Sequence, residues 1–367
     1  MNIGVLGGGQ LGRMLALAGY PLGFRLWFYD SAPDAVAGHV APLTVGGFDD
    51  ATALDRFADG LDLITYEFEN VPVEAARRLA RRVPVWPPPA ALEVAQDRLA
   101  EKQLFTRLGI PTPKFAAVSG PSDLAPALEA VGLPAVLKAR RFGYDGKGQA
   151  VVRSIAEAER TLASFQGVPA IAEAFVRFDR EVSVIAARGG DATAFYPLVE
   201  NVHRAGILHS SRAPAPPRAD SRQADDLERL GRHHAGAIMD AVGYRGVLTV
   251  EFFEVGGRLL ANEIAPRVHN SGHWTIEGSA CSQFENHLRA VAGLPLGGTE
   301  AVGHSGMVNL IGQTPPLPRL LGLGAHVHLY GKEPRPGRKI GHMTTVRHDA
   351  AARDEALASI LSLIDGS

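Results

Sequence analysis

The chain of 367 residues contains a single cysteine, Cys281. One cysteine excludes an internal disulfide framework and a cysteine-rich zinc site, and it is typical of proteins of the reducing cytosol. The sequence also lacks an apolar run of the ~18 residues that a bilayer-spanning helix needs, and its first residues form an apolar strand pattern rather than a signal peptide. We therefore expect a cytoplasmic protein that has no membrane partner.

An excess of positive charge is also absent. The 37 Lys and Arg residues face 39 Asp and Glu residues, which gives a formal net charge of −2. General nucleic-acid binding depends on a basic face, so we expect no nucleic-acid partner. Hydrophobic residues make up 46% of the chain, which is enough for a sizeable core. Because single cores stop growing at roughly 250–300 residues, the length predicts two or three domains.

The pattern of strands and helices predicts an α/β (α+β) protein of three domains. In residues 1–89, strands are expected at 2–6, 24–29 and 61–66, and they alternate with helices such as 10–18. This alternation favours a parallel, Rossmann-like sheet. The domain ends at the prolines 87–89. We assign residues 90–293 to a second domain that begins with one long helix at about 90–108. Further helices are expected at 154–164 and 224–242. Residues 294–367 form a small domain with strands at 307–311, 325–329 and 339–347 and a helix at 354–364.

A glycine-rich turn, GGGQLG at residues 7–12, follows the first strand and precedes the first helix. With Asp30 at the end of the second strand, it matches the fingerprint of dinucleotide-binding domains. The free N–H groups of such a turn bind any phosphate, however, because the helix dipole favours an anion. The alternatives are an NAD-dependent dehydrogenase, a phosphorylated small substrate, and glycines that serve packing alone; we favour the phosphorylated substrate.

A second glycine-rich loop, GYDGKGQ at residues 143–149, follows an apolar strand that ends at Lys138. Arg140, Arg141 and Lys147 crowd the same place, and like charges so close repel one another unless an anion joins them. The loop is not a Walker P-loop, which needs GxxxxGK followed by Ser or Thr. It predicts a lid over nucleotide phosphates, and a lysine that reaches from the edge of the core to water is the alternative for Lys138.

Two glutamates interrupt apolar strand patterns that meet at the glycines 256–257. A lone carboxylate such as Glu251 or Glu263 is costly in such a run unless it is paired or binds a metal, and Mg²⁺ prefers carboxylate and phosphate oxygens. A strict two-residue turn would set Glu251 opposite Asn262 and leave Glu263 on the other face. We therefore predict a longer loop or a bulge that brings both glutamates to one face.

The polar segment APRVHNSGHW at 265–274 comes directly after the second of these strands. Arg267, His269 and Asn270 supply donors that suit a small oxyanion. A structural polar loop is the alternative, and Ser271 with its following glycine disfavours the helix that a zinc site on two of its histidines would need. Upstream, residues 173–176 can offer backbone groups to an adenine edge and Glu181 can accept hydrogen bonds from ribose. Solvated glutamates are the alternative for both Glu173 and Glu181.

Segments 7–14, 98–102, 143–149, 262–274 and 335–342 resemble the signatures of the N5-carboxyaminoimidazole ribonucleotide synthetase family. The likeness extends over essentially the whole chain, and the run NEIAPRVHNSGHW is very specific. The resemblance implies an ATP-grasp fold with a Rossmann-like N-terminal domain and a small β-rich C-terminal domain. It implies a carbon–nitrogen ligase of purine biosynthesis that uses ATP and Mg²⁺. Bicarbonate and 5-aminoimidazole ribonucleotide would give N5-carboxyaminoimidazole ribonucleotide by way of carboxyphosphate.

The resemblance also implies the roles of individual residues. The ATP contacts would be Arg98, Lys138, Gly143, Tyr144, Asp145, Gly146, Lys147, Gly148, Gln149, Glu173, Phe175, Val176, Glu181, His203, Asn262 and Glu263. Glu251 and Glu263 would bind Mg²⁺. The ribonucleotide would contact Gln10, Leu11, Glu67, Tyr144, Asp145, Asn270, Lys332 and Arg338. The catalytic residues would be Asp145, which holds or deprotonates the amine, with Lys147, Arg267, His269 and Asn270.

Two segments depart from the family pattern: residues 173–176 match it only loosely, and Asn70 stands where a histidine is common. The resemblance suggests a homodimer and functional coupling to the mutase that follows in the pathway. The alternatives are a related ATP-grasp ligase that uses formate or carboxylates biotin, the dehydrogenase, and a non-catalytic nucleotide-binding protein.

Overall fold

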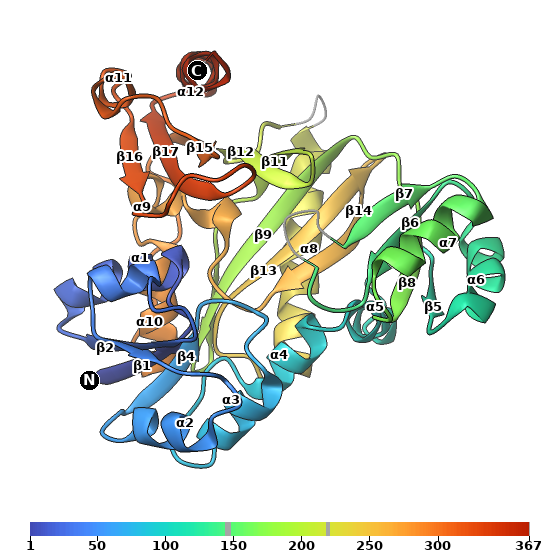
Figure 1. Cartoon of the computed structure of the whole chain (residues 1–367). Helices are drawn as coiled ribbons and strands as arrows, with labels where there is room; N and C mark the ends of the chain where they lie inside the picture. The colour runs from blue at the N-terminus through green and yellow to red at the C-terminus, as the bar shows by residue number, and fades with distance from the viewer. Residues whose placement is uncertain (144–147, 218–220, 367) are drawn as a thin grey trace.

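The computed structural model describes residues 1–143, 148–217 and 221–366, and in these ranges the chain forms three sheets with helices around them (Figure 1). None of the helices in the described ranges is long and apolar enough to cross a membrane. The short 3₁₀ helices are η1 (Tyr20–Leu22), η2 (Val36–His39), η3 (Pro121–Asp123) and η4 (Asn270–Gly272).

The N-terminal sheet has the order β3-β2-β1-β4, and all its pairs are parallel as predicted. Its strands are β1 (Asn2–Leu6), β2 (Arg25–Asp30), β3 (Leu43–Val45) and β4 (Leu63–Tyr66), with helices α1 (Gln10–Gly19), α2 (Ala51–Ala58) and α3 (Val73–Leu79). The carboxyl ends of β1 and β4 lie side by side. The glycine turn at 7–12 and the residues after β4 therefore meet at one edge.

A four-stranded antiparallel sheet of order β5-β8-β6-β7 lies apart from it on the right of Figure 1. Its strands are β5 (Phe115–Val118), β6 (Ala135–Ala139), β7 (Gln149–Val152) and β8 (Ala170–Ala174), and its helices are α6 (Leu124–Val131) and α7 (Ile155–Ser164). Lys138 on β6 pairs with the residue two before Glu173 on β8. These two side chains are therefore diagonal neighbours on one face.

The largest sheet has nine strands in the order β14-β13-β9-β11-β12-β15-β17-β16, with β10 beside β9. The strands are β9 (Arg180–Gly189), β10 (Ala192–Phe195), β11 (Val199–Arg204), β12 (Ile207–Ala213), β13 (Gly246–Val255), β14 (Arg258–Ala265), β15 (His304–Ile311), β16 (His326–Leu329) and β17 (Lys339–Arg347). The helices are α8 (Ser221–Ala241), α9 (Thr275–Gly278), α10 (Gln283–Ala292), α11 (Leu317–Leu321) and α12 (Ala350–Asp365).

One buried cluster joins all three predicted segments, because Leu15, Trp274 and Met307 all belong to it. Helix α1 packs against α10, and β12 pairs with β15 across the boundary predicted at 293. The parts that carry the candidate site are thus held together by continuous packing.

The single helix predicted at 90–108 is wrong. The structure has α4 (Pro89–Ala95) and α5 (Arg98–Arg107), separated at Asp97. The Asp97 carboxylate accepts the N–H groups of Leu99 and Ala100, so it begins a new helix as an N-cap. Arg140 holds the same carboxylate at 2.9 and 2.6 Å. The other predicted helices and the predicted tail strands are present, with ends shifted by a few residues.

Candidate active site

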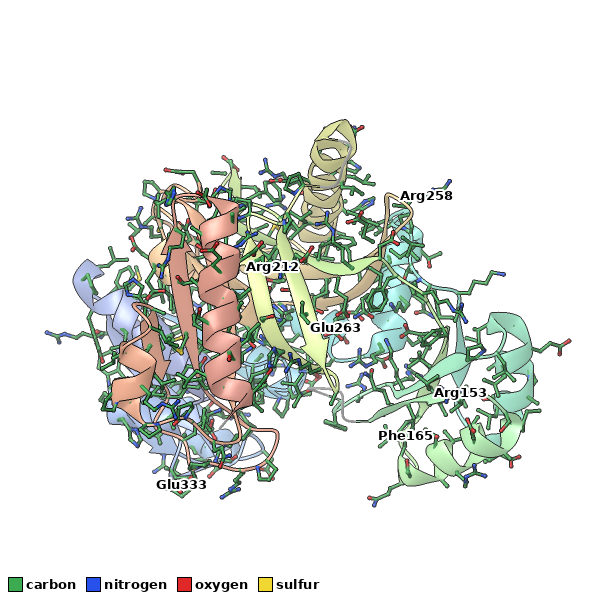
Figure 2. All side chains as sticks on the ribbon, turned by 90° about the horizontal axis from the view of Figure 1, so that it is seen from above. Arg153, Phe165, Arg212, Arg258, Glu263 and Glu333 are labelled. Atoms are coloured by element: carbon green, nitrogen blue, oxygen red, sulfur yellow. The ribbon has the colours of Figure 1, made fainter. Side chains whose placement is uncertain are left out.

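A cleft of about 660 Å³ opens where the three sheets meet. In Figure 2, Glu263 projects between the part of the chain that carries Arg153 and Phe165 and the part that carries Glu333. The predicted site residues that line the cleft are Gln10, Leu11, Glu67, Arg98, Lys138, Gly143, Gln149, Glu173, Phe175, Val176, Glu181, His203, Glu251, Asn262, Glu263, Arg267, His269 and Asn270. Gly148, Lys332 and Arg338 are described but do not line it. Tyr144, Asp145, Gly146 and Lys147 lie outside the described residues.

The hairpin of β13 and β14 brings Glu251 directly opposite Glu263. Its turn is the tight two-residue turn at Gly256 and Gly257, both with positive φ, since the neighbouring residues pair with each other. The register shifts after Glu251, and Asn262 is the extra residue of a β-bulge. The predicted irregularity is confirmed, and it is a bulge rather than a longer loop.

Burial and the neighbouring Glu263 raise the pKa of Glu251 above its ordinary value. Burial also opposes ionisation of Glu263, but Arg98 donates to its carboxylate at 2.9 Å and lowers its pKa. Two facing carboxylates that repel each other fit a divalent cation whose other ligands are phosphate oxygens and water. Within the described ranges, no three His, Cys, Asp or Glu residues form a complete metal site. Mg²⁺ at this pair would therefore need oxygens from a bound nucleotide.

Lys138 is buried, so the alternative of a lysine that reaches to water is wrong. Its Nζ lies 3.0 Å from Glu173 Oε2 and 3.4 Å from Asn262 Oδ1, at the wall of the cleft. Glu173 is also within 3.5 Å of a second buried amine, Lys102 Nζ. Burial would raise the pKa of Glu173, but these two lysines lower it to about 2. Glu173 is therefore an ionised, buried partner of two cations rather than a solvated glutamate.

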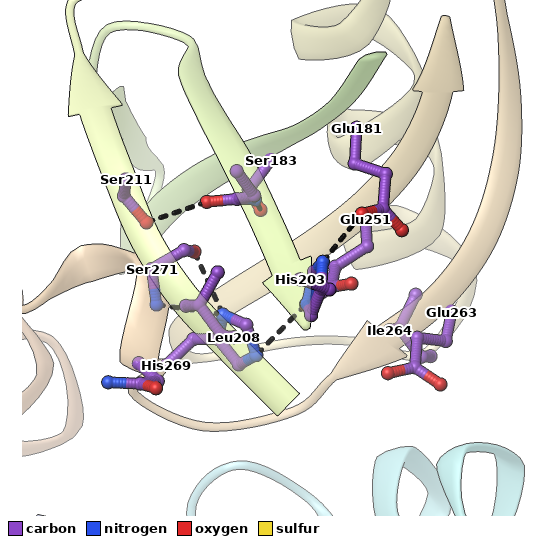
Figure 3. A network of polar contacts seen from close by, with 12 residues as sticks. Glu181, Ser183, His203, Leu208, Ser211, Glu251, Glu263, Ile264, His269 and Ser271 are labelled. Atoms are coloured by element: carbon purple, nitrogen blue, oxygen red, sulfur yellow. Dashed lines mark hydrogen bonds and ion pairs between the residues drawn. The ribbon is translucent and has the colours of Figure 1, made fainter. Parts of the chain in front are cut away.

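Polar contacts join β9 to β11 and join β13 to the segment after β14, and both sets lie at the cleft (Figure 3). His203 Nδ1 lies 2.6 Å from Glu181 Oε2, and His269 Nε2 lies 3.1 Å from Glu251 Oε1. The Ser271 N–H points at His269 Nδ1, which places the ring hydrogen on Nε2, facing Glu251. Burial and the nearby Arg267 lower the pKa of His269 well below its ordinary value, so the ring is neutral.

The other predicted oxyanion ligands face the same cleft. The Arg267 guanidinium is paired with Glu69, and the amides of Asn270 and Asn309 exchange hydrogen bonds of 3.0 and 2.7 Å. His273 does not join His269 in a metal site. It is buried against His342, with ring centres 4.7 Å apart, and it does not line the cleft.

The glycine turn is where the structure differs most from the sequence-based expectation. The buried Glu67 carboxylate accepts the N–H groups of Gly9 and Gly12 at 2.9 and 3.2 Å, and Asp30 accepts the N–H of Gly8 at 2.6 Å. A Cβ at Gly9 would lie 2.7 Å from Glu67 Oε1, which explains the glycine there. The chain's own carboxylates thus occupy three of the amides of the turn, those of Gly8, Gly9 and Gly12. This leaves fewer free N–H groups for a phosphate than the glycine pattern predicts.

In the C-terminal part, Lys332 donates through Nζ to Oε1 of Gln10, a cleft residue at the start of α1. Arg338 donates to the carbonyl of Glu333 at 3.1 Å. Sequence reasoning missed Glu69 and Lys339, which line the cleft, and Lys102 and Asn309, which support its walls. Lys102 lies within the signature at 98–102, but no local pattern marks the other three.

Comparison with known proteins identifies the architecture. Models of the ribonucleotide synthetase preATP-grasp domain, the ATP-grasp domain and the phosphoribosylaminoimidazole carboxylase C-terminal domain match residues 1–96, 103–284 and 305–356. N5-carboxyaminoimidazole ribonucleotide synthase of Pseudomonas aeruginosa is 50% identical over all 367 residues and all of its own length. The Brucella melitensis protein of the same name is 48% identical over 94% of this chain and 96% of its own.

Solved structures agree. The N5-carboxyaminoimidazole ribonucleotide synthetase of Thermus thermophilus superposes with a TM-score of 0.92 at 58% identity, over 99% of this chain and 98% of that one. An Aspergillus clavatus enzyme in complex with ADP and 5-aminoimidazole ribonucleotide gives 0.90 at 30% identity, over 100% and 99%. The chain belongs to the N5-carboxyaminoimidazole ribonucleotide synthase family, and it is an ATP-grasp enzyme that acts as an ATP-dependent carboxylating ligase.

Proposed function

We propose that the cleft is the place where this chain carboxylates 5-aminoimidazole ribonucleotide, with the roles of its residues as set out below. The reaction itself, ATP-dependent conversion to N5-carboxyaminoimidazole ribonucleotide in purine biosynthesis, is that of the family. The observation that carries the assignment is the bulge at Asn262, which sets Glu251 and Glu263 face to face beside Arg98 and Lys138.

The nucleotide lies between the small sheet and the large one. Lys138 and Arg98 face its phosphates, Glu181 and His203 face its ribose, and residues 173–176 flank its base. Glu251 and Glu263 hold Mg²⁺, which supplies charge neutralisation at the phosphate oxygens. This arrangement is supported by the cations and carboxylates along one wall of the cleft. The loop at 143–149, which includes Lys147, acts as the lid in this proposal.

Bicarbonate binds at the opposite wall, where Arg267, His269 and Asn270 offer donors. It attacks the γ-phosphorus of ATP and gives carboxyphosphate and ADP. Carboxyphosphate is unstable in water, so closure of the cleft excludes water while it reacts. The exocyclic amine of the ribonucleotide then takes the carboxyl group and phosphate leaves, with Asp145 holding or deprotonating that amine.

The ribonucleotide is anchored by Gln10, Leu11, Glu67 and Tyr144 on one side and by Lys332 and Arg338 on the other. Because the glycine amides are already hydrogen-bonded to Glu67 and Asp30, the substrate phosphate pairs with the cations of the C-terminal segment instead. We further propose a cytoplasmic homodimer that is coupled functionally to the mutase of the next step, as the family resemblance suggests.

The test is phosphate release from Mg·ATP and bicarbonate, measured with and without 5-aminoimidazole ribonucleotide in the parent protein and in Glu263→Gln. We expect strong stimulation by the ribonucleotide, and its loss in the variant. A rate of phosphate release that does not change when the ribonucleotide is added would point to another acceptor, such as formate or biotin. Hydrolysis that survives unchanged in Glu263→Gln would contradict the metal assignment.

A further inference from the structure

The bulge that aligns the two metal-site glutamates lies on an edge strand. β14 is the first strand in the order of the nine-stranded sheet, so its outer edge has no strand partner. Backbone groups that are left without partners away from water are costly. Several backbone groups around Asn262 nevertheless have partners, and these come from α5 and the two residues at 111–112.

Five hydrogen bonds hold the backbone on both sides of the bulge. Lys102 Nζ donates to the carbonyl of Asn262 at 2.7 Å and to that of Ala261 at 3.2 Å. The Thr112 hydroxyl donates to the same Ala261 carbonyl at 2.8 Å. The Ala261 N–H donates to the Pro111 carbonyl at 2.7 Å, and the N–H of the residue after Glu263 donates to the Glu101 carboxylate at 2.6 Å.

Lys102 is central among these contacts because its side chain is 1% exposed. An ammonium group has three N–H donors, and three acceptors surround this one: the two bulge carbonyls and, at 3.5 Å, the Glu173 carboxylate. Burial lowers the pKa of Lys102, and the Glu173 charge opposes that effect. A neutral amine has only two N–H donors for these three acceptors, so the arrangement fits the charged form.

We propose that Lys102 is a positioning residue for the metal site: it holds the two carbonyls of the Asn262 bulge and so keeps Glu263 opposite Glu251. Lys102 does not line the cleft, so it would act on the metal site through the bulge. Loss of its donors would free the bulge to relax toward the regular register of a two-residue hairpin. That register turns Glu263 to the other face, away from Glu251.

The inference rests on the proposed metal role of the two glutamates, and the test separates the two. ADP binding is measured by calorimetry in Mg²⁺ and in EDTA, and the ratio of the two affinities reports the metal contribution. Lys102→Met removes the donors and keeps the length of the stem. Thr112→Val removes only the neutral hydroxyl that supports the same bulge, without a change in charge. Thr106→Val is the matched control, because its hydroxyl bonds the Lys102 carbonyl within α5, away from the bulge.

We expect Thr112→Val to lower the ratio about threefold, as befits one lost hydrogen bond, and Lys102→Met to lower it about tenfold or more. Raised Mg²⁺ concentration should restore ADP affinity in both variants, and Thr106→Val should match the parent. If Lys102→Met does not fold, Thr112→Val alone decides. An unchanged ratio in folded Thr112→Val, or an equal loss of affinity in Mg²⁺ and in EDTA for Lys102→Met, would overturn the proposal. A parent protein that binds ADP equally in both media would overturn the metal site itself, and the positioning role with it.

Discussion

His287 on α10 joins the two strands that lead to opposite walls of the cleft. Its Nδ1 accepts the N–H of Val247 on β13 at 3.1 Å, and its Nε2 lies 2.8 Å from the Thr65 hydroxyl on β4. Because Val247 donates to Nδ1, the ring hydrogen is on Nε2 and points to Thr65. A second ring proton would face the Val247 N–H directly. Burial accordingly lowers the pKa of His287 from 6.5 to about 3.

This depressed pKa predicts a loss of stability in acid. Above pH 6.5 the ring is neutral in both the folded and the unfolded chain, so it adds no pH dependence. As the pH falls below 6.5, the His287 ring binds a proton in the unfolded chain but stays neutral in the folded chain. The free energy of unfolding therefore decreases by about 1.36 kcal/mol per pH unit. The decrease continues until about pH 3, where the folded ring also takes the proton. At about pH 5 the loss from this one residue is roughly 2 kcal/mol.

The assay is equilibrium urea denaturation followed by tryptophan fluorescence at about pH 7.5 and about pH 5, on the parent protein and on His287→Gln. Glutamine offers an acceptor and a donor but does not titrate. The parent should lose roughly 2 kcal/mol more than the variant between the two conditions. Other buried histidines with lowered pKa, such as His273 and His342, protonate in both proteins and cancel in the difference. Equal losses in the two proteins would refute the reasoning that His287 is held neutral.

Two further substitutions test the cations of the site. If Lys332 anchors the substrate as proposed, Lys332→Met should raise the KM for 5-aminoimidazole ribonucleotide about tenfold and leave kcat nearly unchanged, because the contact would be made in ground and transition state alike. Initial rates measure this, with Glu333→Gln as the control. A shift in the KM for ATP instead would contradict the proposed role. Glu173→Gln should lower the free energy of unfolding by about 3 kcal/mol, because two buried ammonium groups lose their shared carboxylate. Urea denaturation measures that loss, and a value below about 1 kcal/mol would mean that the pairs contribute little net stability.

The sequence predicted those features of the site that depend on neighbours along the chain. Apolar runs interrupted by single acids marked β13 and β14, and the requirement that both glutamates share a face predicted either a longer loop or a bulge, of which the structure has the bulge. Local pattern also predicted the parallel N-terminal sheet and the polar segment after β14. The break at Asp97 was missed because an aspartate is tolerated inside an amphipathic pattern as well as at a cap, and the arginine that fixes it is 43 positions away.

The internal partners of the glycine turn were missed for a related reason. Its spacing indicates only that N–H groups are exposed at a helix start, and it does not say which anion accepts them. The acceptors are Asp30 and Glu67, which are 22 and 58 positions from their glycine donors. Asp30 was expected at the correct strand end, but it bonds Gly8 rather than a ribose. Such pairings are set by which strands are adjacent in the sheet, and a single sequence carries no direct signal for that.

Ion pairs between residues that are far apart in the sequence also line the cleft, and they bear on how it binds a nucleotide. In the structure each main cation of the cleft faces a carboxylate of the chain: Arg98 faces Glu263, Lys138 faces Glu173, and Arg267 faces Glu69. A polyphosphate that arrives alone brings negative charge to a wall that already holds these carboxylates and Glu251. In the proposed site, Glu251 and Glu263 would hold a divalent cation that offsets this charge, and Arg98 would then be available to the phosphates. We therefore expect metal and nucleotide to bind more favourably together than alone, by an amount that depends on the bulge that keeps the two glutamates on one face.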